Sequence, residues 1–253
     1  MMKFLKKFYL GIIMVFLYIP IVVLIVQSFN AGESRANWEG FSLHWYGELL
    51  RDERILNALY VTVSIAVIAM VVSTILGTLA AIGIHAMKKR PQALMMTLTN
   101  LPNTMPDIVT GISLMLLFIS LGIKFGFLTI LLAHITFNIP YVILSVLPRM
   151  KQLNPSTYEA ALDLGCNHWQ AFFKVTFPDL LPGFLMAFTM SLDDFVITHF
   201  TKGPGIDTLS TKIYTEVKKG IKPEMYSLST IIFVVVLVLL LLVNYTPKDK
   251  KNK

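Results

Sequence analysis

Long apolar segments dominate the chain, and short polar stretches separate them. Residues 231–243 form a run of thirteen consecutive apolar residues, and their neighbours at 227–230 and 244–245 extend the run to the roughly 20 residues with which a helix spans a bilayer. Similar segments cover residues 8–26, 59–84, 94–121, 127–147 and 180–200, so with 227–245 the pattern predicts six crossings. We therefore expect an all-α, polytopic membrane protein with a single transmembrane domain over residues 1–253.

The polar stretches between these segments predict two external loops and one internal loop. The outer loops are residues 30–57, rich in glycine and aromatic residues, and residues 201–226, in which Leu209, Ile213 and Val217 follow the spacing of an amphipathic helix. The inner loop covers residues 148–179. We interpret the first segment as a retained anchor, because it contains Pro20 and exceeds the roughly 7–15 residues of a signal-peptide core.

Composition and charge agree with this interpretation. The chain is 55% hydrophobic and only 15% charged, with a mean hydropathy of +0.66, which excludes an ordinary soluble domain. Its net charge is +7, and basic residues of short loops mark the cytoplasmic side of a membrane protein. These residues are Lys3, Lys6, Lys7, Lys88, Lys89, Arg90, Arg149, Lys151, Lys174, Lys248, Lys250, Lys251 and Lys253. Both termini are therefore expected in the cytoplasm, and the charge indicates contact with membrane lipid and no nucleic acid.

Three aspartates lie inside the apolar segments, namely Asp107, Asp193 and Asp194. A carboxylate at the centre of a spanning helix costs roughly 2.5–3.5 kcal/mol on insertion scales, so such residues face a polar cavity, a partner or a cation. Two adjacent acids are both ionised most easily when a multivalent cation lies beside them. The pair at positions 193 and 194 therefore points to a cationic substrate, with a structural acid bonded within the helix as the alternative.

Polar residues accompany these acids at helical spacing. The third segment carries Asn100, Asn103, Thr104, Asp107, Thr110 and Gly111, and the fifth carries Ser191, Asp194, Thr198 and Thr201. We expect the first set to form one stripe along a transport path, loosened by Pro102 and Pro106, with a buried network between helices as the alternative. Asp193 lies off the second stripe, so the two adjacent carboxylates need not share one direction, and one can line the path while the other meets a neighbouring subunit.

Other residue types narrow the function further. Trp45 and Tyr46 lie in the first outer loop, where an aromatic face binds an ammonium group or simply anchors the protein at the membrane boundary. The five histidines have no ligand spacing and the lone Cys166 rules out an internal disulfide, so no metal site is expected. The chain has no GxxxxGK[ST] phosphate loop, so we expect no nucleotide or other cofactor to bind to it.

The inner loop has a characteristic pattern. Glu159, Ala160 and Ala161 are followed by Gly165, and the motif ends in the apolar residues Val175 and Phe177. The strong helix formers before a glycine predict a helix, a turn and a second short helix. This motif resembles the cytoplasmic coupling loop of binding-protein-dependent ABC importer permeases, in which the Glu-Ala-Ala hairpin docks on an ATPase. An amphipathic hairpin lying on the membrane surface is the alternative.

Further segments resemble the polyamine (spermidine/putrescine) permeases of this class, specifically the shorter, C-type subunit. They are residues 18–30, 105–118, 134–143, 191–196 and 212–224, and the likeness covers nearly the whole chain. The resemblance implies a type I importer fold and a substrate path through Trp45, Asp107, Ser191, Asp193 and Asp194. The same likeness assigns ATPase coupling to Glu159, Ala160, Ala161 and Gly165.

The resemblance also implies an assembly in the bacterial inner membrane. This chain would join a second homologous permease, two copies of an ATP-binding subunit that carry ATP and Mg²⁺, and an external polyamine-binding protein. It would be a transport subunit and no enzyme. Two alternatives remain open: an importer permease for another solute, such as ferric ion, thiosulfate or an amino-acid derivative, and a cation-coupled secondary carrier using the same acids.

Overall fold

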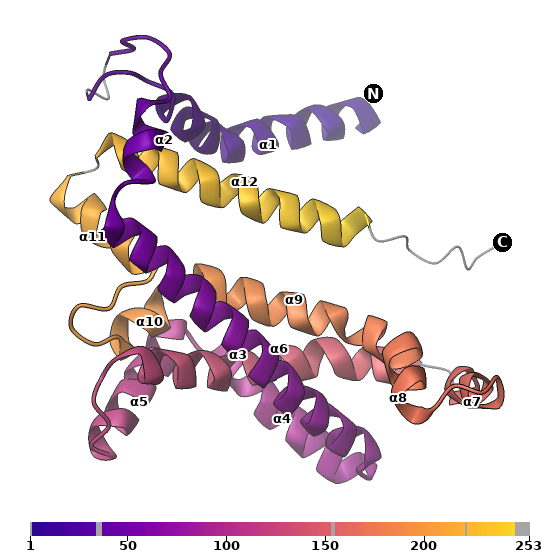
Figure 1. The fold of residues 1–253 in the computed structure, drawn as a ribbon. Helices are drawn as coiled ribbons and strands as arrows, with labels where there is room; N and C mark the ends of the chain where they lie inside the picture. The colour runs from indigo at the N-terminus through magenta and orange to yellow at the C-terminus, as the bar shows by residue number, and fades with distance from the viewer. Residues whose placement is uncertain (1, 34–36, 153–154, 221, 246–253) are drawn as a thin grey trace. The chain divides into compact units, whose positions relative to one another are not determined.

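The computed structural model describes residues 2–33, 37–152, 155–220 and 222–245, and these form helices joined by short loops (Figure 1). The chain divides into two compact units, which we describe separately. One unit comprises Met1–Leu56 and Ile213–Lys253, and the other comprises Asn57–Lys212. The helical content agrees with the all-α prediction, and the only strand pairing in the described residues is an isolated bridge between Asn30 and Phe41.

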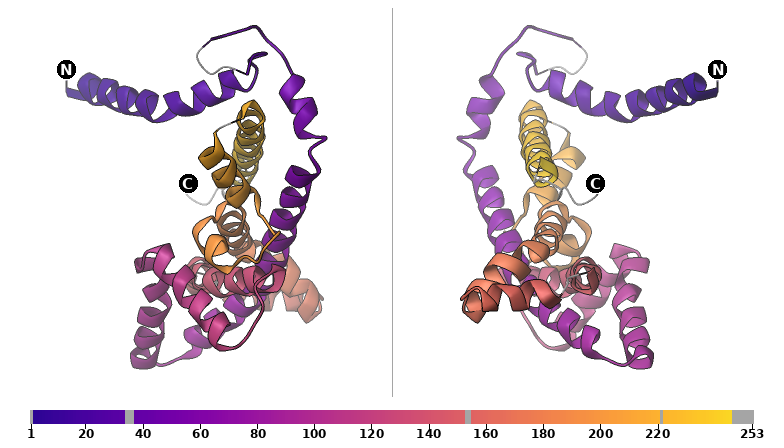
Figure 2. Two further views of the ribbon diagram at one scale, coloured as in Figure 1. Left: turned by 90° about the vertical axis from the view of Figure 1, so that its left-hand side faces the viewer. Right: turned by 90° about the vertical axis from the view of Figure 1, so that its right-hand side faces the viewer.

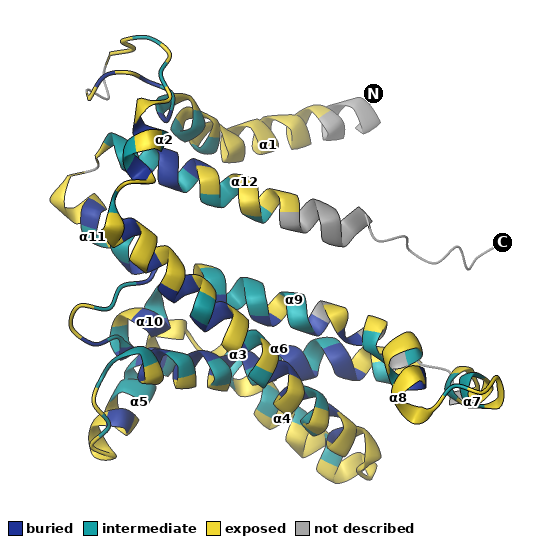
Figure 3. Cartoon of the chain, in the orientation of Figure 1, coloured by how far each residue is buried: buried dark blue, intermediate teal, exposed yellow. Residues whose placement is uncertain are grey.

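The first unit is built on the two helices at the ends of the chain. Its elements are α1 (Met2–Gln27), the short α2 (His44–Leu49) and α12 (Pro223–Tyr245), and α12 contacts both of the others. The Ser227 hydroxyl donates to the Ser28 carbonyl oxygen at 3.3 Å, which joins α12 to the end of α1. Almost the whole described surface of α1 is exposed (Figure 3), as expected for a helix whose apolar side chains face lipid or another subunit.

The second unit holds most of the remaining helices. They are α3 (Glu53–Ala86), α4 (Lys89–Thr104), α5 (Asp107–Ser120), α6 (Phe127–Gln152), α7 (Pro155–Asp163), α8 (His168–Ala171), a π-helix (Phe172–Thr176), α9 (Phe177–Asp193), α10 (Val196–Thr201) and α11 (Leu209–Lys219), with α3 and α11 extending past the boundary. Antiparallel packing of α6 and α9 forms the core, in which Val142, Val146 and Leu147 contact Leu180 and Ala187.

Three helices in the described residues are long and apolar enough to cross a membrane. They are Phe8–Gln27, Glu53–Ala86 and Phe127–Gln152, and the pair α4 and α5 passes the same test only when taken together. Shorter apolar helical stretches cover Gly183–Asp193 and Pro223–Val238. Several apolar spans are therefore present, while the total of six crossings stays a prediction.

The third expected crossing, 94–121, is broken in its middle. Helices α4 and α5 meet at an angle of 101°, and Met105 between them adopts an extended backbone with φ −86° and ψ 146°. Pro106 explains the break, because its ring disfavours a helical conformation at the preceding residue and it has no N–H to donate. The expected continuous stripe from Asn100 to Gly111 is therefore wrong, since Asp107 begins a new helix in another direction.

The fifth expected crossing, 180–200, is broken as well. Helix α9 ends at Asp193, and α10 begins at Val196 after two non-helical residues. The break places Asp193 at the carboxyl end of one helix and Asp194 just before the amino end of the next. The two breaks, at Met105–Pro106 and at Asp194–Phe195, determine where the intramembrane acids lie.

Gly203 follows α10 at a point where two backbones approach closely. A Cβ atom at this position would lie 2.2 Å from the carbonyl oxygen of Phe125, which belongs to the loop before α6. We expect Gly203→Ala to lower the free energy of unfolding by about 1–3 kcal/mol, the usual cost of overpacking. Thermal unfolding of the purified protein in detergent measures this, with Gly83→Ala as the control because no atom lies within 4 Å of its added Cβ. Equal melting temperatures for the two variants would contradict the expected clash.

Candidate functional site

A cavity of about 290 Å³ in the second unit brings the three intramembrane acids together. Its lining consists of Asp107, Phe137, Tyr141, Met190, Asp193, Asp194, Phe195, Val196 and Ile197. Three carboxylates, three aromatic rings and a few aliphatic side chains therefore surround one space. This combination suits a ligand that is positively charged at its ends or along its length and apolar in between.

The two broken helices supply the acids of this cavity. Asp107 lies in the first turn of α5, Asp193 is the last residue of α9, and α5 packs against α10. A helix leaves its last four carbonyl groups without intrahelical partners and carries a partial negative charge at that end. The end of α9 therefore adds to the negative potential that the carboxylates create, and helix breaks of this kind often form substrate sites in transporters.

The two adjacent aspartates have different environments. Asp194 is held by the protein: its carboxylate accepts hydrogen bonds from the backbone N–H groups of Ile197 (3.2 Å) and Thr198 (2.8 Å) and from the Thr198 hydroxyl (2.8 Å). Its side chain is only 9% exposed and lies 3.5 Å from the His134 Nε2 atom. Asp194 thus caps the first turn of α10.

Asp193 is exposed at the cavity and differs from Asp194 in its contacts. Within the described residues, no ion pair joins its carboxylate and no side chain donates to it, while its backbone oxygen accepts a hydrogen bond from Ser210 Oγ at 3.5 Å. The two carboxylates therefore differ in their hydrogen-bond partners, although both residues line the cavity. Of the pair, Asp193 is the acid whose charge is available to a ligand.

Aromatic rings form part of the cavity wall. Phe137 and Tyr141 lie one turn apart on α6, with ring centroids 6.3 Å apart and planes at 88°, and Phe195 lies in the break between α9 and α10. An ammonium group over an aromatic face gains roughly 0.5–2 kcal/mol, depending on how far it is desolvated. The rings therefore offer a second mode of cation binding beside the carboxylates.

Two residues expected on the substrate path, Ser191 and Trp45, are not among the lining residues of this cavity. Ser191 is buried, and its hydroxyl accepts a hydrogen bond from Asn138 Nδ2 at 2.7 Å, so it joins α9 to α6 and is not among the lining residues. Trp45 belongs to the first unit, where it is 9% exposed and its indole N–H donates to the Asn30 carbonyl oxygen at 2.9 Å. Their roles in transport stay predictions.

Sequence reasoning missed the contribution of α6 to this site. His134, Phe137, Asn138 and Tyr141 follow the spacing i, i+3, i+4 and i+7, which places them on one face of the helix. Two of these four lie at the cavity, and the other two hold the segment that carries the acids. The signal was a histidine and an asparagine one turn apart within an otherwise apolar segment.

The hairpin between α6 and α9 has the helix, turn and short helix that its sequence predicts. Helix α7 ends in two hydrogen bonds typical of a Schellman motif, from Gly165 N to Leu162 O (2.9 Å) and from Cys166 N to Ala161 O (3.0 Å). Gly165 has a φ of +87°, the left-handed conformation that this motif requires. The Asn167 and Gln170 side chains then form a reciprocal capping box at the start of α8.

This hairpin lies at the end of the α6–α9 pair, where it faces the viewer in the right-hand view of Figure 2. Several of its apolar side chains are exposed. Leu164 is 86% exposed and Trp169 is 73% exposed. The Trp169 ring stacks on that of Phe173, with centroids 6.4 Å apart. Glu159 and Ala160 are also exposed, on α7. We call Leu164, Trp169 and Phe173 the apolar knob, and such an exposed cluster is typical of a docking surface.

The left-handed Gly165 provides a test of the hairpin itself. An Ala side chain at this position would meet no atom within 4 Å, so the substitution changes only the backbone preference. We expect Gly165→Ala to destabilise the turn by about 1–2 kcal/mol, the cost of a left-handed conformation for a non-glycine residue. Limited proteolysis of the purified protein measures the effect as faster cleavage between residues 160 and 170, and an unchanged cleavage rate would contradict it.

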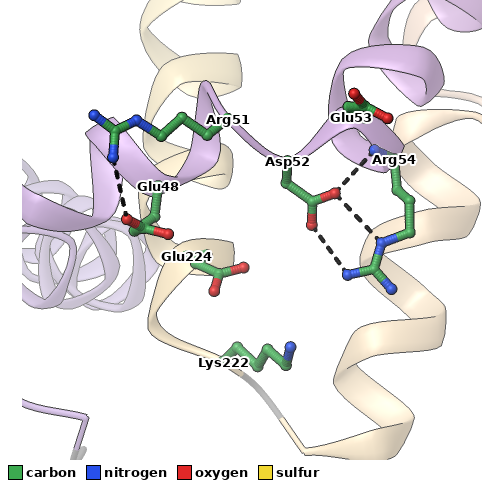
Figure 4. Close-up of a pocket in the computed structure, with 7 residues that line it drawn as sticks. All are labelled: Glu48, Arg51, Asp52, Glu53, Arg54, Lys222 and Glu224. Atoms are coloured by element: carbon green, nitrogen blue, oxygen red, sulfur yellow. Dashed lines mark hydrogen bonds and ion pairs between the residues drawn. The ribbon is translucent and has the colours of Figure 1, made fainter.

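The first unit has a charged pocket of its own, formed where α2, the start of α3 and the start of α12 meet (Figure 4). Its lining consists of Glu48, Arg51, Asp52, Glu53, Arg54, Lys222 and Glu224. Ion pairs join Arg51 to Glu48 at 3.9 Å and Arg54 to Asp52 at 3.4 Å. Burial pushes the pKa of Asp52 upward, but hydrogen bonds and charge from Arg54 outweigh it and hold the pKa below its usual value. The pocket is therefore a charged surface suited to a polar partner.

The family model and the curated relatives that match this chain all describe membrane components of transport systems. Residues 73–246 match the model of the family described as binding-protein-dependent transport system inner membrane component. The chain is 35% identical over 252 residues to the spermidine/putrescine transport system permease protein PotC of Escherichia coli (strain K12), covering 98% of this chain and 96% of that protein. It is 40% identical over 228 residues to the putrescine transport system permease protein PotI of the same strain, covering 86% and 81%.

Solved structures agree on the fold. A bacterial ABC transporter involved in the import of the acidic polysaccharide alginate has a chain that matches with a TM-score of 0.68 at 18% identity, covering 99% of this chain and 96% of that one. The fold is therefore that of an ABC importer permease, and the curated relatives are permease subunits. On this evidence the chain belongs to the family of inner membrane components of binding-protein-dependent transport systems.

Proposed function

We propose that this chain is the transmembrane permease subunit of an ATP-driven importer that carries polyamines such as spermidine and putrescine into the cytoplasm. The observation that carries the proposal is the cavity in which Asp107 and Asp193 lie beside Tyr141. A linear amine has ammonium groups for the carboxylates and methylene spacers for the aromatic rings. The names of the PotC and PotI relatives support the same class of substrate.

In the proposed mechanism, the carboxylates and aromatic rings of the cavity stabilise a cation that has left bulk water. The carboxylates of Asp107 and Asp193 replace part of the hydration shell of the ammonium groups, and the rings cover the methylene chain. The cavity is small and partly open, so affinity there stays moderate and the cargo can leave again. Closure of the ATPases around ATP moves the hairpins, and the helices rock to open the path on alternate sides.

The assembly that we propose has four membrane-associated subunits and one external partner. A second permease completes the path, two ATP-binding subunits hold ATP and Mg²⁺, and a polyamine-binding protein delivers the substrate. The hairpin with Glu159, Ala160, Ala161 and Gly165 would dock on an ATPase through the apolar knob. The charged pocket around Asp52 is a suitable contact for the binding protein. No cofactor is assigned to this chain.

We also propose that both termini and the hairpin lie in the cytoplasm. Support comes from the exposed basic residues Lys88, which lies between α3 and α4, and Lys89 and Arg90, which begin α4, because basic residues accumulate on the cytoplasmic side. With this orientation the charged pocket and the loop at residues 202–208 lie on the outer side.

Substrate competition in cells tests the proposal. The complete transporter is produced in a host that lacks polyamine uptake, and entry of radiolabelled spermidine is measured with a hundredfold excess of unlabelled solutes. We expect putrescine and spermidine to compete, and thiosulfate, ferric citrate and neutral amino acids to have no effect. Absence of spermidine uptake, or uptake that continues when the ATPase subunits carry an inactivating Walker A substitution, would contradict an ATP-driven polyamine importer.

A further inference from the structure

Helix α6 carries a ladder of buried polar side chains that holds the broken fifth segment. Thr129 Oγ1 donates to the Thr201 carbonyl oxygen (2.7 Å), and Asn138 Nδ2 donates to the Ala187 carbonyl oxygen (3.2 Å). Between them, His134 Nε2 lies 2.8 Å from the Thr198 hydroxyl oxygen. His134 is fully buried, as is Thr198. The ladder therefore ties both sides of the break between α9 and α10 to one rigid helix.

The hydrogen bonds around His134 indicate which of its two ring nitrogens is the donor. The Thr198 hydroxyl gives its single proton to the Asp194 carboxylate at 2.8 Å, so the Thr198 oxygen accepts from His134 and the imidazole carries a proton on Nε2. The other ring nitrogen, Nδ1, is buried and has no hydrogen-bond partner in the described part of the chain. The Nε2 nitrogen therefore faces the Thr198 oxygen, and the Asp194 carboxylate lies 3.5 Å from the same nitrogen.

The hydrogen bonds from His134 to Thr198 and from Thr198 to Asp194 hold the backbone at the break between α9 and α10. With His134 behind it, the Thr198 hydroxyl has one orientation, toward Asp194, whose carboxylate also accepts the N–H groups of Ile197 and Thr198. These three hydrogen bonds hold the Asp194 carboxylate at the start of α10. Asp193 is bonded directly to Asp194, so the direction of its carboxylate depends on the same contacts.

We propose that His134 is a positioning residue for amine binding, which acts through Thr198 and Asp194 to hold the Asp193 carboxylate at the cavity. The inference rests on the proposed function, since it assigns to Asp193 the contact with the ammonium group. His134 itself is not among the lining residues of the cavity and touches no substrate there. Its effect is on the position of a charge, and small displacements of a binding group change transport strongly.

The test is a double-mutant cycle measured in vesicles that contain the complete transporter. The variants are His134→Ala, Asp193→Asn and both together, and the quantity measured is the half-saturating spermidine concentration at equal amounts of complex. We expect His134→Ala to raise this concentration about 10-fold with a maximal rate within about threefold of the parent. In the Asp193→Asn background the same change should raise it less than about twofold, because coupled residues are not additive.

Two further variants separate positioning from stability. His134→Gln can still donate a hydrogen bond from its amide, so it should restore the half-saturating concentration to within about threefold of the parent. Thr198→Val removes the hydroxyl that relays the contact and should match His134→Ala, which keeps the test valid if His134→Ala fails to reach the membrane. His85→Ala is the control, because His85 is an exposed histidine at the end of α3.

The outcomes distinguish the inference from the function on which it rests. If Asp193→Asn reduces amine affinity but His134→Ala reduces it further by the same factor, His134 acts independently and the inference is wrong. An unchanged half-saturating concentration in both His134→Ala and Thr198→Val would also overturn it. If Asp193→Asn alone has no effect, the proposed amine site fails and the inference fails with it.

Discussion

Replacement of Asp193 by Asn is expected to raise the half-saturating polyamine concentration about 10- to 100-fold while the protein stays in the membrane at its normal level. The amide has the shape of the carboxylate but no charge, so the variant loses one charge-assisted hydrogen bond to an ammonium group. Such a bond contributes about 1.5–3 kcal/mol, which corresponds to this range of affinity. Radiolabelled spermidine uptake over a range of concentrations measures the effect.

The neighbouring acid provides the sharpest contrast for this prediction. Asp194→Asn should lower the melting temperature of the purified protein, because Asp194 caps α10 and accepts three hydrogen bonds from Ile197 and Thr198. Glu33→Gln serves as the charge control, since Glu33 is an exposed acid of the outer loop. If Asp193→Asn transported normally and Asp194→Asn lost affinity without losing stability, the assignment of the two acids would be reversed.

We expect substitutions in the apolar knob to weaken binding of the ATP-binding subunit to this chain. Trp169 is 73% exposed and stacks on Phe173, and large aromatic side chains at the centre of an interface often contribute 2 kcal/mol or more to binding. We therefore expect Trp169→Ser to reduce co-purification of the ATP-binding subunit by more than about 10-fold and uptake in proportion. The measurement is affinity purification through this chain, followed by quantification of the bound ATPase.

A matched tryptophan controls for nonspecific effects of the substitution. Trp38 is 54% exposed in the loop before α2, outside the hairpin, so Trp38→Ser should leave ATPase binding unchanged. Normal ATPase recovery with Trp169→Ser would exclude the apolar knob as the coupling surface. Equal loss with both variants would show instead that the measurement reports folding.

The sequence predicted the helical fold and the acids because both depend on local signals. Runs of apolar residues set the helices, and the rarity of Asp107, Asp193 and Asp194 in such runs marked them as functional. The structure places all three at one cavity. The hairpin was equally accessible, because a glycine four residues after Ala161 is a local requirement of the Schellman turn.

The features that could not be predicted from the sequence depend on contacts between segments that are distant in the chain. The 101° bend at Pro106 broke the expected stripe, because a proline permits either a mild kink or a full break and packing decides between them. The role of His134 was missed because its partner Thr198 lies 64 residues away. The adjacent aspartates were distinguished only by the donors around Asp194, which belong to a helix that begins after the break.

Reconstitution of the purified complex in lipid vesicles tests the central claim most directly. The complex is supplied with ATP and the loaded binding protein, and ATP hydrolysis and accumulation of linear amines are measured together. We predict that spermidine or putrescine accumulates in the vesicles at the expense of ATP, and that Asp107→Asn with Asp193→Asn raises the half-saturating concentration sharply while basal hydrolysis continues. A complex that hydrolyses ATP but transports none of the linear amines, or one in which the doubly substituted cavity transports them with parental affinity, would contradict the account.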